Sequence, residues 1–355
     1  MEITERIRTL ESILKEWEDI EDINAGSLTN TGFLPIDYGL FGFRRSQLNI
    51  LAGRPGTGKT TLALNIMHNV SKRLQPNEYI LFISLEQDDY SILEKFIAMN
   101  GLYSLNNFKG IRNYKRDLLS DIHSIANRVS KLQVLTSTDP SFRIEYLEEI
   151  INKLERQGIK IVAVFLDHLQ ITETKQVNLL KYEKLTKITR TLKTAALRLN
   201  IPIIALSQLS RESVKQASNK TEQAAPSLTH LRDSGSIEQD ADTVLYLCDA
   251  PQEAQPTNKH IKTIELHVLK NRNGRCGYSN LNFVPEFALM EDEGANLRIR
   301  KHILNAQSME TIYKDVIRSY NEAERLQELR RQNEEIKNIV KQEAERKAKE
   351  NNEVK

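Results

Sequence analysis

The clearest chemical signal in the sequence is a glycine-rich run that fits the pattern G-x-x-x-x-G-K-[ST]. It follows an apolar strand candidate and precedes an apolar helical stretch, which is the setting that a phosphate-binding loop requires and a chance turn lacks. Glycines let backbone N–H groups surround phosphates, and the N-terminus of the next helix attracts negative charge. Lys59 can reach the outer phosphates, and the hydroxyl of Thr60 can ligate Mg²⁺. The predicted nucleotide-binding residues are Gly53, Arg54, Pro55, Gly56, Thr57, Gly58, Lys59, Thr60 and Thr61.

Two carboxylates are placed to complete such a site. Asp167 follows six apolar residues, where the acid that organises Mg²⁺ and its water is expected. Glu86 closes another predicted strand, and the C-terminal ends of parallel strands meet at one edge, so Glu86 is a candidate base for the attacking water. The alternatives are a buried Asp167 that is satisfied by backbone groups, and a Glu86 that only favours the N-terminus of the next helix.

Three further features follow later strands. The predicted strand 202–209 ends in LSQL, which places Gln208 at the same edge, so its amide could contact a γ-phosphate and report hydrolysis to the next loop. That loop, 210–230, is long and polar; long loops without regular structure are usually functional or disordered. Arg211 and Lys215 make it locally basic, a weak indication of nucleic-acid binding. Lys270 and Arg272 end a strand before a turn, where Arg272 is either solvated or a finger into a neighbour's γ-phosphate.

The elements that must position these residues alternate between strand and helix, which is typical of a parallel sheet covered on both faces. Two strands around Asn273-Gly274, over 262–285, form a predicted hairpin. The predicted strands are 47–53, 79–86, 132–136, 159–170, 202–209 and 242–249. The predicted helices are 59–74, 90–101, 114–131, 143–157 and 178–199.

The two ends of the chain differ from this centre. Residues 3–20 predict an amphipathic helix that docks either on its own domain or on a neighbour. Residues 24–35 are small, polar and turn-forming, and predict a linker. Residues 303–355 lack Gly and Pro and are rich in charge, which predicts a charged helical or partly disordered tail, with a coiled-coil partner site as the alternative. The chain is therefore predicted to consist of an N-terminal helix (1–24), one large α/β domain (25–302) and a charged tail (303–355).

Composition limits the remaining classes of protein. The formal net charge of the 355 residues is +2, so any basic surface is local, such as a channel lining. Cys248 and Cys276 show no metal-type spacing, and a reducing compartment is the simpler interpretation. The charged N-terminus is unlike a signal peptide, and no apolar run approaches the ~20 residues of a membrane helix. The sequence therefore predicts a soluble cytoplasmic protein without a membrane partner.

The run of segments resembles the C-terminal ATPase domain of the DnaB-type replicative DNA helicases. The similar segments occur in that family's order over about residues 25–295. They are TGFLPID, the P-loop, SLEQ, FLDHLQI, ITRTLKTAALRLNIPIIALSQLSR, LRDSGSIEQDADTVLYL and KNRNG. LRDSGSIEQDAD after ALSQLSR is far more specific than the P-loop, which many unrelated NTPases share. The resemblance implies a RecA-like α/β P-loop core that hydrolyses ATP with Mg²⁺, assembles as a homo-oligomer, commonly a hexamer, and unwinds DNA.

Carried over by position, the resemblance implies a role for each matching residue. Glu86 would be the catalytic base and Gln208 the γ-phosphate sensor, while Lys270 and Arg272 would act in trans on the adjacent subunit's nucleotide. Single-stranded DNA would pass through the central channel and contact the LRDSG segment, where a charged side chain and backbone amides follow phosphates without reading bases. Those contacts are Arg232, Asp233 and Gly235. The 3–20 helix would match the family's linker helix, and a primase or helicase loader is a possible partner.

The sequence departs from the family pattern in several places. The helical domain that contacts primase is expected to be missing, which would suit a phage, plasmid or other mobile element. SLEQ stands where SLEM is usual, and His168 stands where Tyr is usual; neither change removes a catalytic group. Loop 210–230 does not follow the family pattern, so its DNA contacts are not among those that the resemblance implies. The alternative function is a nucleotide-switched DNA-binding or scaffold ATPase of the RecA/KaiC type that never unwinds a duplex.

Overall fold

The computed structural model describes residues 9–10, 27–106, 108, 116–208, 228, 235–257 and 260–293. The chain divides into two compact units, of which one comprises residues 1–105 and 125–295 and the other residues 106–124 and 296–355. The candidate site residues of the described part all belong to the first unit. The predicted 3–20 helix, apart from Thr9 and Leu10, and the predicted tail lie outside the described residues.

A nine-stranded sheet in the order β3-β2-β4-β5-β1-β6-β7-β8-β9 organises the first unit. The first six strands in this order pair in parallel, and β7, β8 and β9 add an antiparallel extension. The strands are β1 Leu48–Gly53, β2 Glu78–Ser84, β3 Val134–Ser137, β4 Lys160–Asp167, β5 Ile203–Gln208, β6 Thr243–Asp249, β7 Lys262–Asn271, β8 Gly277–Val284 and β9 Leu289–Asp292. The predicted, mostly parallel α/β core is thus confirmed.

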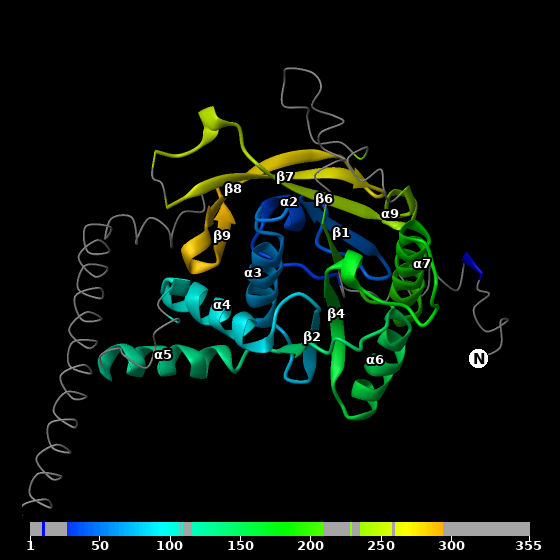
Figure 1. The fold of residues 1–355 in the computed structure, drawn as a ribbon, viewed down its shortest axis with the longest axis horizontal. Coiled ribbons are helices and arrows are strands. Elements are labelled where there is room, and N and C mark those ends of the chain that lie inside the picture. Colours follow the sequence, from blue (N-terminus) through cyan, green and yellow to red (C-terminus); the bar gives the residue numbers. More distant parts are fainter. Residues whose placement is uncertain are drawn as a thin grey trace, which may run out of the picture. The chain divides into compact units, whose positions relative to one another are not determined.

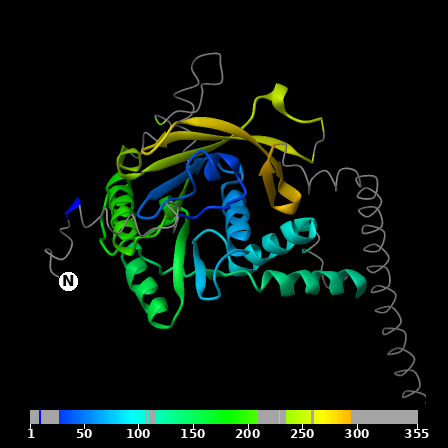
Figure 2. The same ribbon diagram turned by 180° about the vertical axis from the view of Figure 1, so that it is seen from behind.

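Helices cover both faces of this sheet, as Figures 1 and 2 show from opposite sides. On one face α6, α7 and α9 pack over alternate side chains of β1, β2, β4, β5 and β6 in one apolar core. On the other face α3 contacts β1, β2 and β9, with α4 packed beside α3. The helices are α2 Leu34–Asp37, α3 Lys59–Ser71, α4 Asp89–Gly101, α5 Arg116–Val129, α6 Leu147–Arg156, α7 Lys181–Leu199 and α9 Gly235–Asp240. Within the described residues, none is long and apolar enough to cross a membrane.

The central strands are buried on both faces, which explains why their sequences are continuously apolar. Every residue of β1 is buried, and from Ala163 onward so is β4. Burying one Leu, Ile or Phe side chain contributes about 1.5–3 kcal/mol. This rigid centre fixes the strand ends, and therefore the loops that follow them.

The predicted linker 24–35 is wrong from Leu28 onward. Leu28 pairs with Phe43 in an isolated antiparallel bridge, and Phe33 has no exposed surface. Asp37 accepts hydrogen bonds from the backbone of Thr31 and Gly32, which folds this stretch back onto α2. Small polar residues indicated a linker, but the buried side chains of Leu28 and Phe33 attach the segment to the core.

Candidate active site

The glycine-rich loop connects the buried end of β1 to the first turn of α3. Gly56 and Gly58 have φ angles of +80° and +90°, in the left-handed region that favours glycine. A Cβ at Gly58 would also lie 2.8 Å from the Met290 side chain. The Gly58 position caps α3 without a side-chain hydrogen bond, so the first N–H groups of this helix remain available to an anion.

Lys59 lies largely buried at the start of α3. Its Nζ donates a hydrogen bond to the backbone oxygen of Arg54 at 2.9 Å, which closes the loop on itself. Burial lowers the pKa of the Lys59 amino group, while the carboxylates of Asp167 and Glu86 oppose that shift. Phosphate oxygens would oppose it further, because added negative charge favours the charged amine.

Thr60, at the start of α3, is in direct contact with Asp167, at the end of β4. The Thr60 hydroxyl donates to Asp167 Oδ2 at 2.7 Å, and Asp167 is only 1% exposed. Burial raises the pKa of Asp167, and the hydrogen bond from Thr60 opposes this shift. A hydroxyl and a carboxylate are hard oxygen ligands of the kind that Mg²⁺ prefers, so the pair fits that ion chemically.

Glu86 lies beside this pair, although it follows β2 rather than ending it. The Leu85 N–H donates to the Asp167 carbonyl at 2.8 Å, so the β2 and β4 ends stay together past the strands. Glu86 Oε2 lies 3.0 Å from Nδ1 of His168, and the Glu86 side chain is 53% exposed. Asp88, not Glu86, caps α4 by accepting from the Ser91 N–H. Glu86 is therefore free of the capping role and faces the site.

Two site residues were missed from the sequence. Burial lowers the pKa of the Lys95 amino group, and the negative charges of Asp167 and Glu86 oppose that shift, so this cation is close enough to interact electrostatically with both carboxylates. Lys95 lies between the buried Ile92 and Phe96 of α4. A lysine on the apolar face of a helix was the available signal.

Gln170 is the second missed residue, and it joins the Asp167 strand to the Gln208 strand. Its amide Nε2 donates to the Ser207 hydroxyl at 3.0 Å, and its Oε1 accepts from the Gln208 N–H at 3.0 Å. Gln208 is also the parallel partner of Gly53 across β5 and β1. The predicted sensor position therefore lies at the edge that holds the loop.

Lys270 and Arg272 lie at the opposite edge of the sheet, because β7 runs antiparallel to β6. Arg272 Nη1 donates to Asp242 Oδ1 at 3.0 Å, and Asp242 Oδ2 accepts from the Leu48 N–H at the start of β1. The six residues of β1 separate this point from the loop by about 20 Å at ~3.3 Å per residue. The pair therefore lies far from the loop of its own chain.

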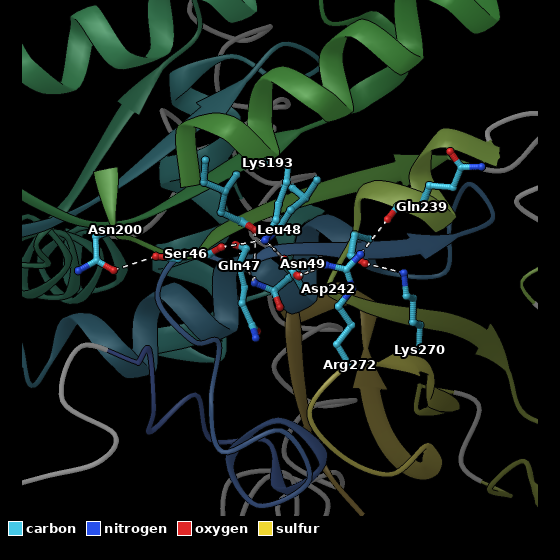
Figure 3. Close-up of polar contacts among 12 residues, drawn as sticks. Ser46, Gln47, Leu48, Asn49, Lys193, Asn200, Gln239, Asp242, Lys270 and Arg272 are labelled. Carbon is cyan, nitrogen blue, oxygen red and sulfur yellow. Dashed lines mark hydrogen bonds and ion pairs between the residues drawn. The ribbon is translucent and has the colours of Figure 1, made fainter. Parts of the chain in front are cut away.

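Asp242 is the centre of the network that holds Arg272 (Figure 3). Besides Arg272 and Leu48 it accepts from Lys193 Nζ at 2.6 Å, and Lys193 also donates to the Ser46 carbonyl at 3.0 Å. Lys270 Nζ donates to the Ala241 carbonyl at 2.7 Å. One buried carboxylate thus connects α7, β1, β6 and the end of β7.

We expect Asp242→Ala to lower the free energy of unfolding by about 2 kcal/mol, because it removes three hydrogen bonds and leaves Lys193 and Arg272 without their carboxylate partner. Chemical denaturation followed by circular dichroism measures this. Asp249→Ala is the matched control, since Asp249 is exposed at the other end of the same strand. Equal stability of the two variants would show that Asp242 contributes no more than a surface acid.

Of the five predicted DNA contacts, Gly235 alone belongs to the residues that the structure describes. Arg211, Lys215, Arg232 and Asp233 lie outside the described residues. Gly235 is exposed at the first position of α9.

Comparison with known proteins gives one consistent family. The sequence model of the DnaB-like helicase C terminal domain matches residues 29–292. The replicative DNA helicase DnaB of Mycoplasma genitalium is 31% identical over 276 residues, which cover 74% of this chain and 57% of that protein. The probable plasmid replicative DNA helicase of Chlamydia psittaci is 34% identical over 254 residues, or 71% of this chain and 53% of that protein. The chain spans between a half and two thirds of the length of these curated relatives.

Solved structures agree with the sequence match. One solved ATPase domain superposes with a TM-score of 0.69 at 26% identity, covering 80% of this chain and 98% of that one. A DnaB-like replicative helicase, described with its interactions with primase, gives a TM-score of 0.67 at 26% identity over 81% and 67% of the two chains. With the loop, the two carboxylates and the strand order already in place, this chain belongs to the DnaB-like helicase C-terminal domain family.

Proposed function

We propose that this chain is the motor domain of an ATP-dependent, ring-forming helicase that moves along single-stranded DNA and unwinds duplex DNA during replication. The observation that carries the proposal is the separation of two half-sites on one sheet. The P-loop, Asp167 and Glu86 gather at one edge, while Lys270 and Arg272 lie at the other. A complete site then forms between two copies, as a ring of identical subunits would provide.

The half-site at the P-loop supplies the hydrolytic chemistry. Thr60 and Asp167 would hold Mg²⁺, which when bound neutralises charge on the phosphates of ATP. Lys59 contacts the outer phosphate oxygens, and Lys95 adds a second positive charge beside the carboxylates. Glu86 accepts the proton of the attacking water, with His168 at 3.0 Å holding the carboxylate in place. Arg272 of the next copy stabilises charge on the transferred phosphoryl group.

Contacts on α9 give a route from the interface to DNA. Lys270 donates to the carbonyl of Ala241 just after α9, and Arg272 Nη2 donates to the carbonyl of Gln239 at 3.1 Å. The same helix begins at Gly235, the last residue of the LRDSG segment proposed to contact the DNA backbone. Withdrawal of Arg272 toward a neighbour's nucleotide would therefore release one end of the helix whose other end contacts DNA. Gln208, at the end of β5, would contact the γ-phosphate and transmit its loss to the loop at 210–230 that follows it.

Two measurements test this function: the effect of single-stranded DNA on the ATPase rate, and the displacement of a strand from duplex DNA. We expect single-stranded DNA to raise the ATPase rate severalfold and ATP to drive strand displacement from a forked duplex. Lys59→Ala is the control, because it keeps the fold but removes a phosphate contact. ATP hydrolysis without any strand displacement would instead favour the RecA/KaiC-like scaffold ATPase. The similarity to a helicase described with primase makes primase, or a loader, the further partner that we propose.

A further inference from the structure

Three side chains with metal-binding atoms converge on the antiparallel part of the sheet, away from the Thr60–Asp167 pair. Cys248 of β6 is paired in register with Glu265 of β7, and His267 follows Glu265 by two residues, so all three project from one face. One ligand atom from each lies within 4.8 Å of the others. Sulfur, nitrogen and carboxylate oxygen therefore surround a single point.

Hydrogen bonds and ring stacking hold the three side chains in place. Glu265 Oε2 lies 2.7 Å from His267 Nε2 and 3.8 Å from Cys248 Sγ, so it is the shared acceptor of the cluster. The His267 ring stacks on Tyr278 with centroids 5.1 Å apart and an interplanar angle of 18°. This stacking fixes the orientation of the imidazole, as an outer partner does in metal sites.

A fourth candidate ligand atom, the side-chain oxygen of Asn280, comes from the same face of the sheet. Asn280 of β8 is paired in register with Glu265, as Tyr278 is with His267. The Asn280 Oδ1 atom is buried and, within the part of the chain that the structure describes, has no hydrogen-bond partner. A buried polar atom without a partner is costly, and an ion or a water bound to that ion would satisfy it.

We propose that Cys248, Glu265 and His267 form a binding site for a divalent transition metal of the zinc class, with Asn280 beside its fourth position. Thiolate, imidazole and carboxylate are the protein ligands of zinc, and three of them with one open position make a common site. Mg²⁺ prefers oxygen ligands throughout, so this site differs in chemistry from the Thr60–Asp167 pair. On binding, the Cys248 thiol proton leaves to solvent and the sulfur–metal bond replaces the S–H bond.

A metal ion that binds here has to displace the proton of the Cys248 thiol. Burial and the nearby Glu265 carboxylate raise the pKa of the Cys248 thiol to about 12, so the thiol stays protonated when no ion is present. A divalent cation supplies the positive charge that stabilises a thiolate. Cys276, in contrast, is exposed in the turn between β7 and β8.

The position of the site suggests what the metal does. β6 flanks the P-loop strand, and a Cβ at Gly53 would lie 2.8 Å from the Leu247 carbonyl, next to Cys248. β7 leads from the same site to Lys270 and Arg272. A metal bound there would cross-link β6, which flanks the P-loop strand, to β7, which carries Lys270 and leads to Arg272.

Cobalt(II) is the probe, used with the full chain in excess Mg²⁺. Only a sulfur ligand gives the near-ultraviolet charge-transfer band of a cobalt–thiolate bond. Cobalt bound at Thr60 and Asp167 has no sulfur ligand and therefore does not contribute to this band. We expect the intensity of this band to saturate at one cobalt ion per chain. Cys248→Ser should abolish it, and His267→Gln should weaken cobalt binding by more than about a hundredfold, since losing an outer partner alone costs about 10–100-fold.

Cys276→Ser is the matched control and should keep the full band. Circular dichroism and nucleotide binding establish that each variant is folded. Loss of the band in Cys276→Ser would overturn the proposal. Absence of the band from the unmodified protein at stoichiometric cobalt would also overturn it, and this second result needs no variant.

Discussion

Glu86→Gln should reduce ATP turnover by about a hundredfold to ten-thousandfold, the range that a general base contributes. The amide keeps the size of the side chain and can still accept a hydrogen bond from His168, but it cannot take a proton from water. The P-loop, Thr60 and Asp167 are unchanged, so nucleotide binding should persist. Single-turnover hydrolysis together with binding of a fluorescent ATP analogue separates the two quantities.

Glu149→Gln is the matched control, because Glu149 is exposed on α6 and touches no part of the site. It should leave both hydrolysis and binding unchanged. Full ATPase activity in purified Glu86→Gln would remove Glu86 from the role of base. Another group near Asp167 would then have to activate the water.

The parts of the site that the sequence predicted are those fixed by local structure. A strand, a glycine-rich turn and a helix occur within one continuous segment, so the P-loop needed no tertiary knowledge. Asp167 followed from the rule that parallel strands end at one edge. The Gln208 position followed in the same way, because β5 pairs directly with β1.

What escaped prediction depends on contacts between distant segments. Lys95 has the spacing of the apolar face of α4, but only the packing of that helix beside α3 shows that this face lies near Asp167 and Glu86. The Asp242 network joins Asp242 to residues from three other parts of the chain, and no pattern in the sequence indicates it.

The Cys248 cluster was missed for a similar reason. Metal motifs are recognised by close spacing, but Cys248 and Glu265 are 17 positions apart and meet only through strand register. The same register decided the place of Arg272. The sequence suggested that Arg272 reaches a neighbour's γ-phosphate, but it did not show that the antiparallel direction of β7 places Arg272 at the edge away from its own P-loop.

Arg272→Ala should lower ATP turnover by about a thousandfold or more, the effect expected for an arginine that acts in trans on a transferred phosphoryl group. Its own P-loop should still bind nucleotide, since about 20 Å of strand separates the two. Arg275→Ala is the control, because Arg275 is exposed on the same turn. Steady-state hydrolysis by the two variants at equal concentration makes the comparison.

Mixing Arg272→Ala with Lys59→Ala tests the central claim, that ATP is hydrolysed at the junction between two copies of this chain. Each variant alone should be inactive, but the first has an intact P-loop and the second an intact Arg272. Random mixing in a ring should make about a quarter of the junctions competent at equal proportions. We predict that hydrolysis rises from near zero to a maximum at that ratio. Hydrolysis that stays at the level of the separate variants at every ratio would contradict an active site shared between subunits.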